Sequence, residues 1–126
     1  MNASSDVAEQ VIADLSFDRD GLVPAIAQSD ETGEVLMLAY MNADAVRETL
    51  GTGRVCYWSR SRQALWRKGE SSGHVQQLVE LRYDCDNDAV LLRVRQSGPA
   101  CHTNRPNCFY HAVREGRVTI ISEPEA

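Results

Sequence analysis

The 126-residue chain has no long hydrophobic segment, no basic stretch at its start and no excess of positive charge. No apolar run approaches the roughly 18 residues that a membrane helix needs. The first 15 residues include acidic side chains and no basic one, so we expect no secretory signal. A net charge of −5 argues against broad, non-specific binding to nucleic acid. We therefore expect a cytoplasmic protein with neither a membrane nor a nucleic-acid partner.

Internal repeats, low-complexity segments and long linkers are also absent. A chain of this length can bury a core of its own, so we expect a single domain over residues 1–126. The four cysteines include no C-x-x-C pair, which disfavours a redox dithiol. Because disulfides are rare in the cytoplasm, metal binding is the more attractive role for these thiols.

Hydrophobic periodicity predicts an α+β domain dominated by strands, with about seven short strands in hairpins and two short helices. Helices are expected at residues 5–15 and 43–50, and strands at 22–28, 35–41, 54–58, 76–84, 89–96 and in a closing hairpin within 109–121. The segment 35–41 is apolar at nearly every position, so we expect both of its faces to be buried. Cys56 fits a buried strand cysteine. The order of the strands is not readable from the sequence.

Residues 54–68 form a positive segment in an otherwise acidic chain. It contains five basic residues and no acidic one: Arg54, Arg60, Arg62, Arg67 and Lys68. Ser71, Ser72 and Gly73 follow, and His74 closes the segment. Arginine side chains and backbone amides are the groups that hold phosphates. The alternatives are a solvated basic loop, or an RNA contact, which the short length of the patch and the acidity of the chain disfavour.

The stretch from Asp84 to Cys108 contains two kinds of metal ligand. Asp84, Asp86 and Asp88 alternate with other residues around Cys85. Carboxylate oxygens suit hard cations such as Mg²⁺. Alternation over residues 76–84 places Val79, Leu81 and Tyr83 on one face of a strand. If it continues, Cys85 joins that face and the aspartates point the other way. The pattern therefore favours two separate metal sites.

A cysteine pair follows on a proline-containing loop. Cys101 lies sixteen residues after Cys85, His102 is next to it, and Cys108 comes seven residues later. Three thiolates with a fourth position open to water are typical of a catalytic zinc site. His102 would be a fourth ligand or would act on the bound water. A small non-catalytic zinc module that recognises an anionic partner through residues 54–68 remains an alternative. A further alternative involves no metal: turns favour aspartate in any case, and Cys85 would be an inert core cysteine.

Three blocks in this order resemble the phosphoribosyl-AMP cyclohydrolase family, a hydrolase of histidine biosynthesis. They read YWSRSRQALWRKGESSGH, DCDND and ACHTNRPNCFYH. The resemblance covers about residues 20–113, and the length matches the monofunctional form of the family. It implies hydrolytic opening of the N1–C6 bond of N1-(5-phosphoribosyl)-AMP to the formimino-carboxamide ribotide, a step of L-histidine biosynthesis.

The resemblance also implies ligands and an assembly. Asp84, Asp86 and Asp88 match the Mg²⁺ ligands of the family, and Cys85, Cys101 and Cys108 match its Zn²⁺ ligands. The family forms a compact homodimer whose zinc site is shared, with Cys85 from one subunit and the other two cysteines from its partner.

A mechanism follows as a hypothesis. Zinc-activated water attacks C6, and His102 or His74 is the general base. The two phosphates of the substrate are expected to contact the basic and small residues of the first block: Ser59, Arg60, Arg62, Lys68, Ser71, Ser72 and Gly73.

Overall fold

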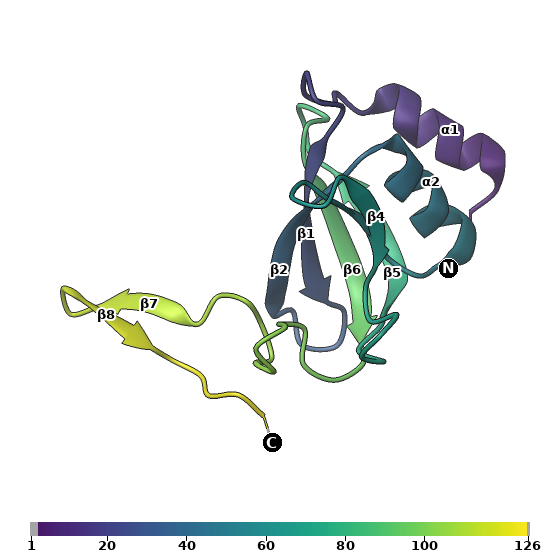
Figure 1. Ribbon diagram of the computed structural model, residues 1–126. Coiled ribbons are helices and arrows are strands. Elements are labelled where there is room, and N and C mark those ends of the chain that lie inside the picture. Colours follow the sequence, from purple (N-terminus) through teal and green to yellow (C-terminus); the bar gives the residue numbers. More distant parts are fainter. Residues whose placement is uncertain (1–2, 126) are drawn as a thin grey trace.

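A computed structural model of the chain describes residues 3–125, with two helices beside a curled six-stranded sheet (Figure 1). The elements in chain order are α1 (Ser5–Asp14), β1 (Val23–Ser29), β2 (Val35–Met41), α2 (Ala43–Thr52), β3 (Cys56–Ser59), β4 (Ala64–Arg67), β5 (Gln76–Tyr83), β6 (Val90–Gln96), β7 (His111–Arg114) and β8 (Arg117–Ile120). The large sheet has the order β4-β3-β2-β1-β6-β5, and β7 and β8 form a separate hairpin. The predicted strand-rich α+β class is confirmed.

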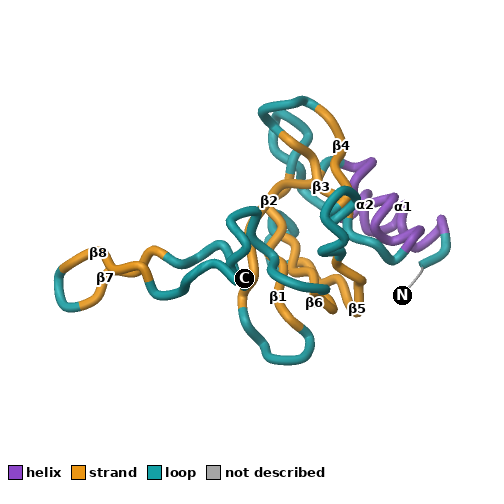
Figure 2. Tube along the Cα trace, turned by 60° about the horizontal axis from the view of Figure 1, so that its bottom comes forward, coloured by secondary structure: helices purple, strands orange, loops and turns teal. Residues whose placement is uncertain are grey.

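Both helices begin at a side chain that caps them. Ser4 accepts a hydrogen bond from the amide of Val7, and Asn42 accepts one from Ala45 at 2.8 Å. Helix α2 ends at Gly53, whose φ of 77° is the left-handed conformation that glycine adopts without strain. The helices lie side by side against the sheet (Figures 1 and 2). Among residues 3–125, no helix is long and apolar enough to cross a membrane.

The three hairpins expected from the sequence are present, but one strand was missed. Strand β4 lies within the stretch interpreted as a basic loop, and it pairs antiparallel with β3 through Trp58 and Leu65. It has only four residues and ends at Arg67, and the turn before it uses Gln63 at a φ of 51° instead of a glycine. The usual sequence signals of a hairpin were therefore missing.

Strand β5 contains a bulge that changes which side chains face the core. The register with β6 shifts between Leu78 and Glu80. Before the bulge, Leu78 is buried in the core. After the bulge, it is the odd-numbered residues Leu81 and Tyr83 that pack on the core. The prediction that Val79 shares the face of Leu81 and Tyr83 is wrong, because a bulge inserts one residue into the alternation.

Strand β6 pairs with β5 on one side and, in parallel, with β1 on the other. This parallel pairing connects residues more than sixty positions apart, and the sequence did not predict it. It determines which loops lie at each end of the sheet. The turn 84–89 lies at the end where β1 begins, and the loop 97–107 lies at the end where β2 begins (Figure 1).

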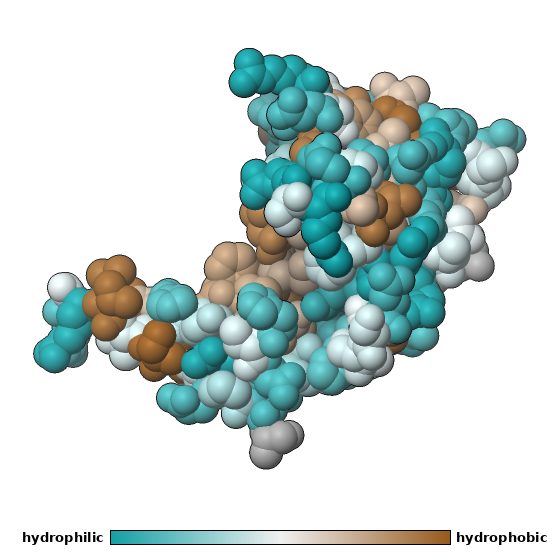
Figure 3. Space-filling model, in the orientation of Figure 1, coloured by the Kyte–Doolittle hydropathy of each residue, from teal (hydrophilic) through white to brown (hydrophobic). Residues whose placement is uncertain are grey.

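The sheet face away from the helices is apolar and only partly covered. Strand β2 buries Met37 and Met41 in the core, but Val35 and Leu38 are each 46% exposed. The prediction that both faces of residues 35–41 are buried is therefore wrong for the single chain, because the elements of residues 3–125 leave Val35 and Leu38 on this side exposed. Figure 3 shows apolar surface in the hollow between the sheet and the C-terminal hairpin.

The hairpin of β7 and β8 projects from the body of the domain (Figures 1 and 2). Its paired residues Val113 and Val118 are 76% and 69% exposed. Near the C-terminus, the Glu125 amide donates to the Asn104 carbonyl at 2.8 Å. The tail thus runs back along the loop 97–107.

Candidate active site

A cleft of about 320 Å³ collects most of the side chains that the sequence singled out. Its lining consists of Arg62, Trp66, Arg67, Lys68, Gly69, Glu70, Ser71, Ser72, His74, Pro99, Cys101, His102 and Asn104. These residues come from strand β4, from the loop that follows it, and from the loop 97–107. Strands β5 and β6 pair antiparallel, and the first residue of β5, Gln76, lies opposite the last residue of β6, Gln96. The loop before β5 and the loop after β6 therefore meet.

The cysteine loop is held at several points by its own backbone. The amide of Cys101 donates to the Arg105 carbonyl at 3.1 Å, and the amide of Asn104 donates back to the Cys101 carbonyl at 3.0 Å. The Cys108 amide donates to the carbonyl of Leu36 at 2.8 Å, which ties the end of the loop to β2. These bonds bring two thiols together on an irregular segment.

The two thiols of the loop differ in acidity. Burial opposes ionisation of Cys101, but hydrogen bonds from Thr103 and Cys108 and the charge of Lys68 outweigh it, so the pKa of Cys101 is lowered. The Thr103 hydroxyl lies 3.1 Å from the Cys101 Sγ. Burial, and then the charge on Cys101, raises the pKa of Cys108 to about 11. Cys101 therefore ionises first, and a cation that offsets both charges is the group that would allow the second thiol to ionise.

Lys68 has a different position from the one expected of a free phosphate ligand. Its ammonium donates to the Ala100 carbonyl and lies 5.7 Å from the centre of the Trp66 ring. Burial lowers the pKa of Lys68, and the charges of the two cysteines oppose this. The lysine thus braces the loop beside the thiols, and two of its three N–H donors remain for a ligand.

The serine and glycine loop lines the cleft with Gly69, Ser71 and Ser72, and Gly73 follows outside the lining. Gly73 has a φ of 81°, and no atom lies within 4 Å of the place where a side chain would begin. The Ser72 hydroxyl accepts the amide of His74 at 3.1 Å, while Ser71 is exposed. Gly69 has the same φ but no space, because an added Cβ would lie 2.6 Å from the carbonyl oxygen of His74.

Ser59 and Arg60 do not line this cleft. The Ser59 hydroxyl accepts the amide of Arg62 at 3.2 Å and so stabilises the turn between β3 and β4. The Arg60 guanidinium lies 4.0 Å from the centre of the Tyr40 ring. Arg60 and Trp58 instead line two neighbouring hollows of about 490 and 370 Å³ on the uncovered side of β2.

The aspartate-rich segment is a turn and not an extension of β5. The strand ends at Tyr83, and Asp84 Oδ1 accepts the amides of Asp88 at 3.0 Å and Ala89 at 3.3 Å. Cys85 is exposed, so the prediction that it shares the apolar face of Leu81 and Tyr83 is wrong. Strand alternation stops where the turn begins.

Carboxylates crowd one another in this turn. Hydrogen bonds, the backbone amide of Asp88 first among them, lower the pKa of Asp84. A hydrogen bond with the Asp84 side chain, and then its charge, raises the pKa of Asp88. A cation between the two side chains would relieve this repulsion, which fits a hard ion such as Mg²⁺. Asp86 is exposed in the same turn.

A single chain does not bring Cys85 to the cysteine loop. The seven residues of β6 separate the turn from the loop, a span of about 20 Å at 3.3 Å per residue. Within residues 3–125, no three histidine, cysteine, aspartate or glutamate side chains are grouped so that they could hold a metal ion. Cys101 and Cys108 fit as two thiolate ligands, and a tetrahedral zinc site needs others.

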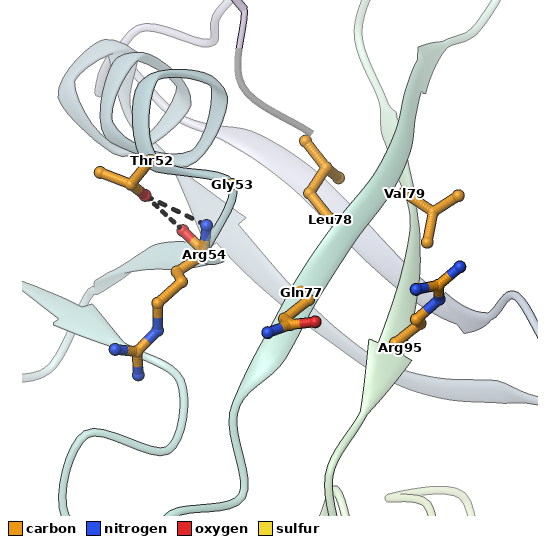
Figure 4. Close-up of a pocket in the computed structure, with 7 residues that line it drawn as sticks. All are labelled: Thr52, Gly53, Arg54, Gln77, Leu78, Val79 and Arg95. Carbon is orange, nitrogen blue, oxygen red and sulfur yellow. Dashed lines mark hydrogen bonds between the residues drawn. The ribbon is translucent and has the colours of Figure 1, made fainter.

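A second cavity, of about 440 Å³, lies beside the end of α2 and is drawn in Figure 4. Arg54 and Arg95 lie on either side of Gln77 there. The Thr52 hydroxyl accepts the amide of Arg54 at 3.1 Å. The lining contains no thiol, imidazole or carboxylate, so the smaller cleft with Cys101 is the better candidate for catalysis.

Sequence reasoning missed several residues in the cleft or in contact with its thiol. Thr103 follows Cys101 by two positions, and the tendency of threonine hydroxyls to bond to near neighbours was a usable signal. Trp66 was hidden because β4 was not recognised as a strand. Glu70 and Asn104 gave no signal of their own.

Comparison with known proteins identifies close relatives. The family model described as phosphoribosyl-AMP cyclohydrolase matches residues 37–110. A protein of that name from Paracoccus denitrificans is 66% identical over 113 residues, covering 90% of this chain and 93% of the relative. One from Rhodospirillum centenum is 63% identical over 119 residues, covering 94% and 90%. Phosphoribosyl-AMP cyclohydrolase 2 from Pseudomonas fluorescens is 64% identical over 114 residues, covering 90% and 78%.

Proposed function

The chain belongs to the phosphoribosyl-AMP cyclohydrolase family, and from this premise we propose that it catalyses the reaction for which the family is named, in histidine biosynthesis. The bond to be hydrolysed is N1–C6 of the adenine ring in N1-(5-phosphoribosyl)-AMP, and the product is the formimino-carboxamide ribotide. The observation that carries the proposal is the convergence of Cys101, two histidines and a basic lining in one cleft.

We propose that the complete site needs two chains. About 20 Å of β6 separates Cys85 from the cysteine loop within one chain, so a shared site has to take Cys85 from a partner. The exposed apolar face of β2 and the projecting hairpin supply surfaces for a homodimer. Isolated chains rarely leave such patches without a partner.

The thiolates of Cys101, Cys108 and the partner's Cys85 would hold Zn²⁺. The zinc would act as a Lewis acid and lower the pKa of a bound water molecule to near neutral pH. The turn with Asp84, Asp86 and Asp88 would hold Mg²⁺. The side chain of Asp84 already contacts Asp88, so two of the three ligands lie close together. All four cysteines of the chain are free, which agrees with a reducing, cytoplasmic location.

The two histidines of the cleft are the candidates for proton transfer. His102 is exposed next to Cys101, and His74 is half-buried on the opposite loop. Either imidazole would accept the proton released as water adds to C6 and return it as the N1–C6 bond opens. A positioned base of this kind contributes about 10²–10⁴-fold.

The phosphates of the substrate are negative groups that need a cationic or amide-rich surface. Arg62, Ser71 and Ser72 line the cleft with such groups, and the backbone of Gly73 next to them has open space around it. Lys68 would stabilise the loop and the thiolates, with its remaining donors directed at a phosphate. Ser59 and Arg60 would reach the substrate only beyond the cleft, from the turn between β3 and β4.

A spectroscopic assay on synthetic phosphoribosyl-AMP, combined with zinc analysis, tests the proposal. The purified protein should open the purine ring and contain about one zinc per chain. Cys101→Ser should lose both the metal and nearly all turnover, while Cys56→Ser, a thiol outside the cleft, should keep both. Turnover by zinc-free Cys101→Ser, or no turnover by the zinc-loaded wild-type protein, would overturn the proposal.

A further inference from the structure

Two polar side chains are completely buried within the described part of the chain, Thr49 and Gln76, each with 0% exposure. Burying an amide is costly unless its hydrogen bonds are made. Gln76 opens β5, and its side chain is buried in the core. Its partners therefore show what this buried amide is for.

The hydrogen bonds of Gln76 form a chain that runs in one direction. The Tyr57 hydroxyl donates to Gln76 Oε1 at 2.7 Å, and Gln76 Nε2 donates to Gln96 Oε1 at 2.9 Å and to the weak acceptor Met37 Sδ at 3.4 Å. Gln96 Nε2 then donates to the carbonyl of His74 at 3.1 Å and to that of Ser97 at 3.2 Å. The chain begins in the core and ends on two backbone carbonyls of the cleft loops.

The end of the chain determines the orientation of every member. Backbone carbonyls accept only, so the amide nitrogen of Gln96 has to face them and its oxygen has to face Gln76. Gln76 must then present its nitrogen to Gln96 and its oxygen to Tyr57, which leaves Tyr57 as the donor. Such chains polarise one another and gain strength together.

The two carbonyls belong to the two loops that form the cleft. His74 is the last lining residue of the serine and glycine loop, and Ser97 begins the loop that bears Cys101. The imidazole of His74 lies against Gly98, where an added Cβ would be 2.7 Å from its Cδ2 atom. At the other end, the ring of Tyr57 lies 5.0 Å from that of Trp66, which also lines the cleft.

We propose that Tyr57, Gln76 and Gln96 are positioning residues that hold His74 and the start of the cysteine loop at a fixed separation. None of the three lines the cleft, so they act through other residues. The proposal rests on the proposed function, because it concerns the histidine and the loop assigned to that chemistry. A displacement of about 1 Å in such a group can cost about 10²-fold in rate.

The test uses Gln96→Met, which keeps the length of the side chain and removes its hydrogen bonds. We expect kcat to fall about 10- to 100-fold with KM and zinc content nearly unchanged. Gln76→Met should do the same, and the double variant should be no worse than either single one, since they break the same chain.

Thr49→Val is the matched control. The Thr49 hydroxyl is equally buried, but it bonds to the backbone of Cys56 at 2.9 and 3.2 Å, and neither residue lines the cleft or contacts its loops through these bonds. We expect a lower Tm and an unchanged kcat. If Gln96→Met lowers only the Tm, as the control does, the positioning role is refuted.

Hydrogen exchange separates this inference from the proposed function. In Gln96→Met, the amides of residues 97–108 should exchange faster than in the wild type and in Thr49→Val. This measurement does not depend on which substrate the enzyme acts on. Unchanged protection there contradicts the positioning chain. A wild-type protein that shows no turnover contradicts the proposed function instead.

Discussion

Gly69 and Gly73 allow the cost of a steric clash to be measured separately from the cost of a backbone conformation. Both have a φ of 81°. A Cβ at Gly73 meets nothing within 4 Å, whereas one at Gly69 would lie 2.4 Å from the backbone nitrogen of Val75 and 2.6 Å from the carbonyl oxygen of His74. Alanine at either position is therefore equally strained, and only one of the two variants collides with the chain.

The expected magnitudes follow from this geometry. A left-handed alanine costs about 1–2 kcal/mol, so Gly73→Ala should lose about that much stability. Gly69→Ala should lose a further amount of about 1–3 kcal/mol, because rigid backbone atoms have to move. Urea titrations at one protein concentration would give both values, and a fixed concentration matters if the folded state is a dimer. Equal losses in the two variants would refute the steric argument.

Three further predictions concern the thiols and the hairpin. Thr103→Val removes the hydrogen bond to Cys101 Sγ and should weaken zinc binding about tenfold in a chelator competition, and an unchanged affinity would contradict its role. Cys56 is buried, and burial followed by the charge of Glu48 raises its pKa to about 12, so iodoacetamide should modify it last of the four cysteines, as mass spectrometry would show. Val118→Asp should convert the homodimer proposed above to monomers in sedimentation experiments, while Thr119→Asp on the other face of β8 should not; dimers that persist in Val118→Asp would argue against this interface.

Local patterns were enough to predict most elements and the fold class. Residues 5–15 and 43–50 were recognised as helices from their caps and spacing, and the structure places α1 and α2 within one or two residues of those limits. Strand β4 was missed because it has only four residues and because the turn before it has Gln63 in place of a glycine. The bulge at Val79 was missed because a bulge leaves the apolar pattern nearly intact.

The cleft was only partly predictable. The sequence named His74 and Cys101 separately, and the predicted hairpin of residues 76–84 and 89–96 already implied that the segments before and after it would meet. The expected strand at 89–96 already separates Cys85 from Cys101. The parallel pairing of β1 with β6, which places the cysteine loop at the end of the sheet where β2 begins, depends on contacts between distant parts of the chain. No local signal reports such a contact.

Exposure of β2 could not be predicted for a related reason. An apolar segment such as residues 35–41 indicates that both faces avoid water, but it does not say which chain supplies the cover. Leu38 is exposed in the single chain, and the dimer proposed here would bury it.

The central claim is that Cys85 of one subunit completes the site on the cysteine loop of the other. Subunit exchange between Cys85→Ala and Cys101→Ala tests it most directly. Each variant alone should be inactive, because both of its sites lack one thiolate. In a mixed dimer one site carries both defects and the other carries none. Random mixing of equal amounts should therefore restore about a quarter of the wild-type turnover and zinc content. A mixture as inactive as its components, under conditions where subunits are shown to exchange, would contradict the shared site.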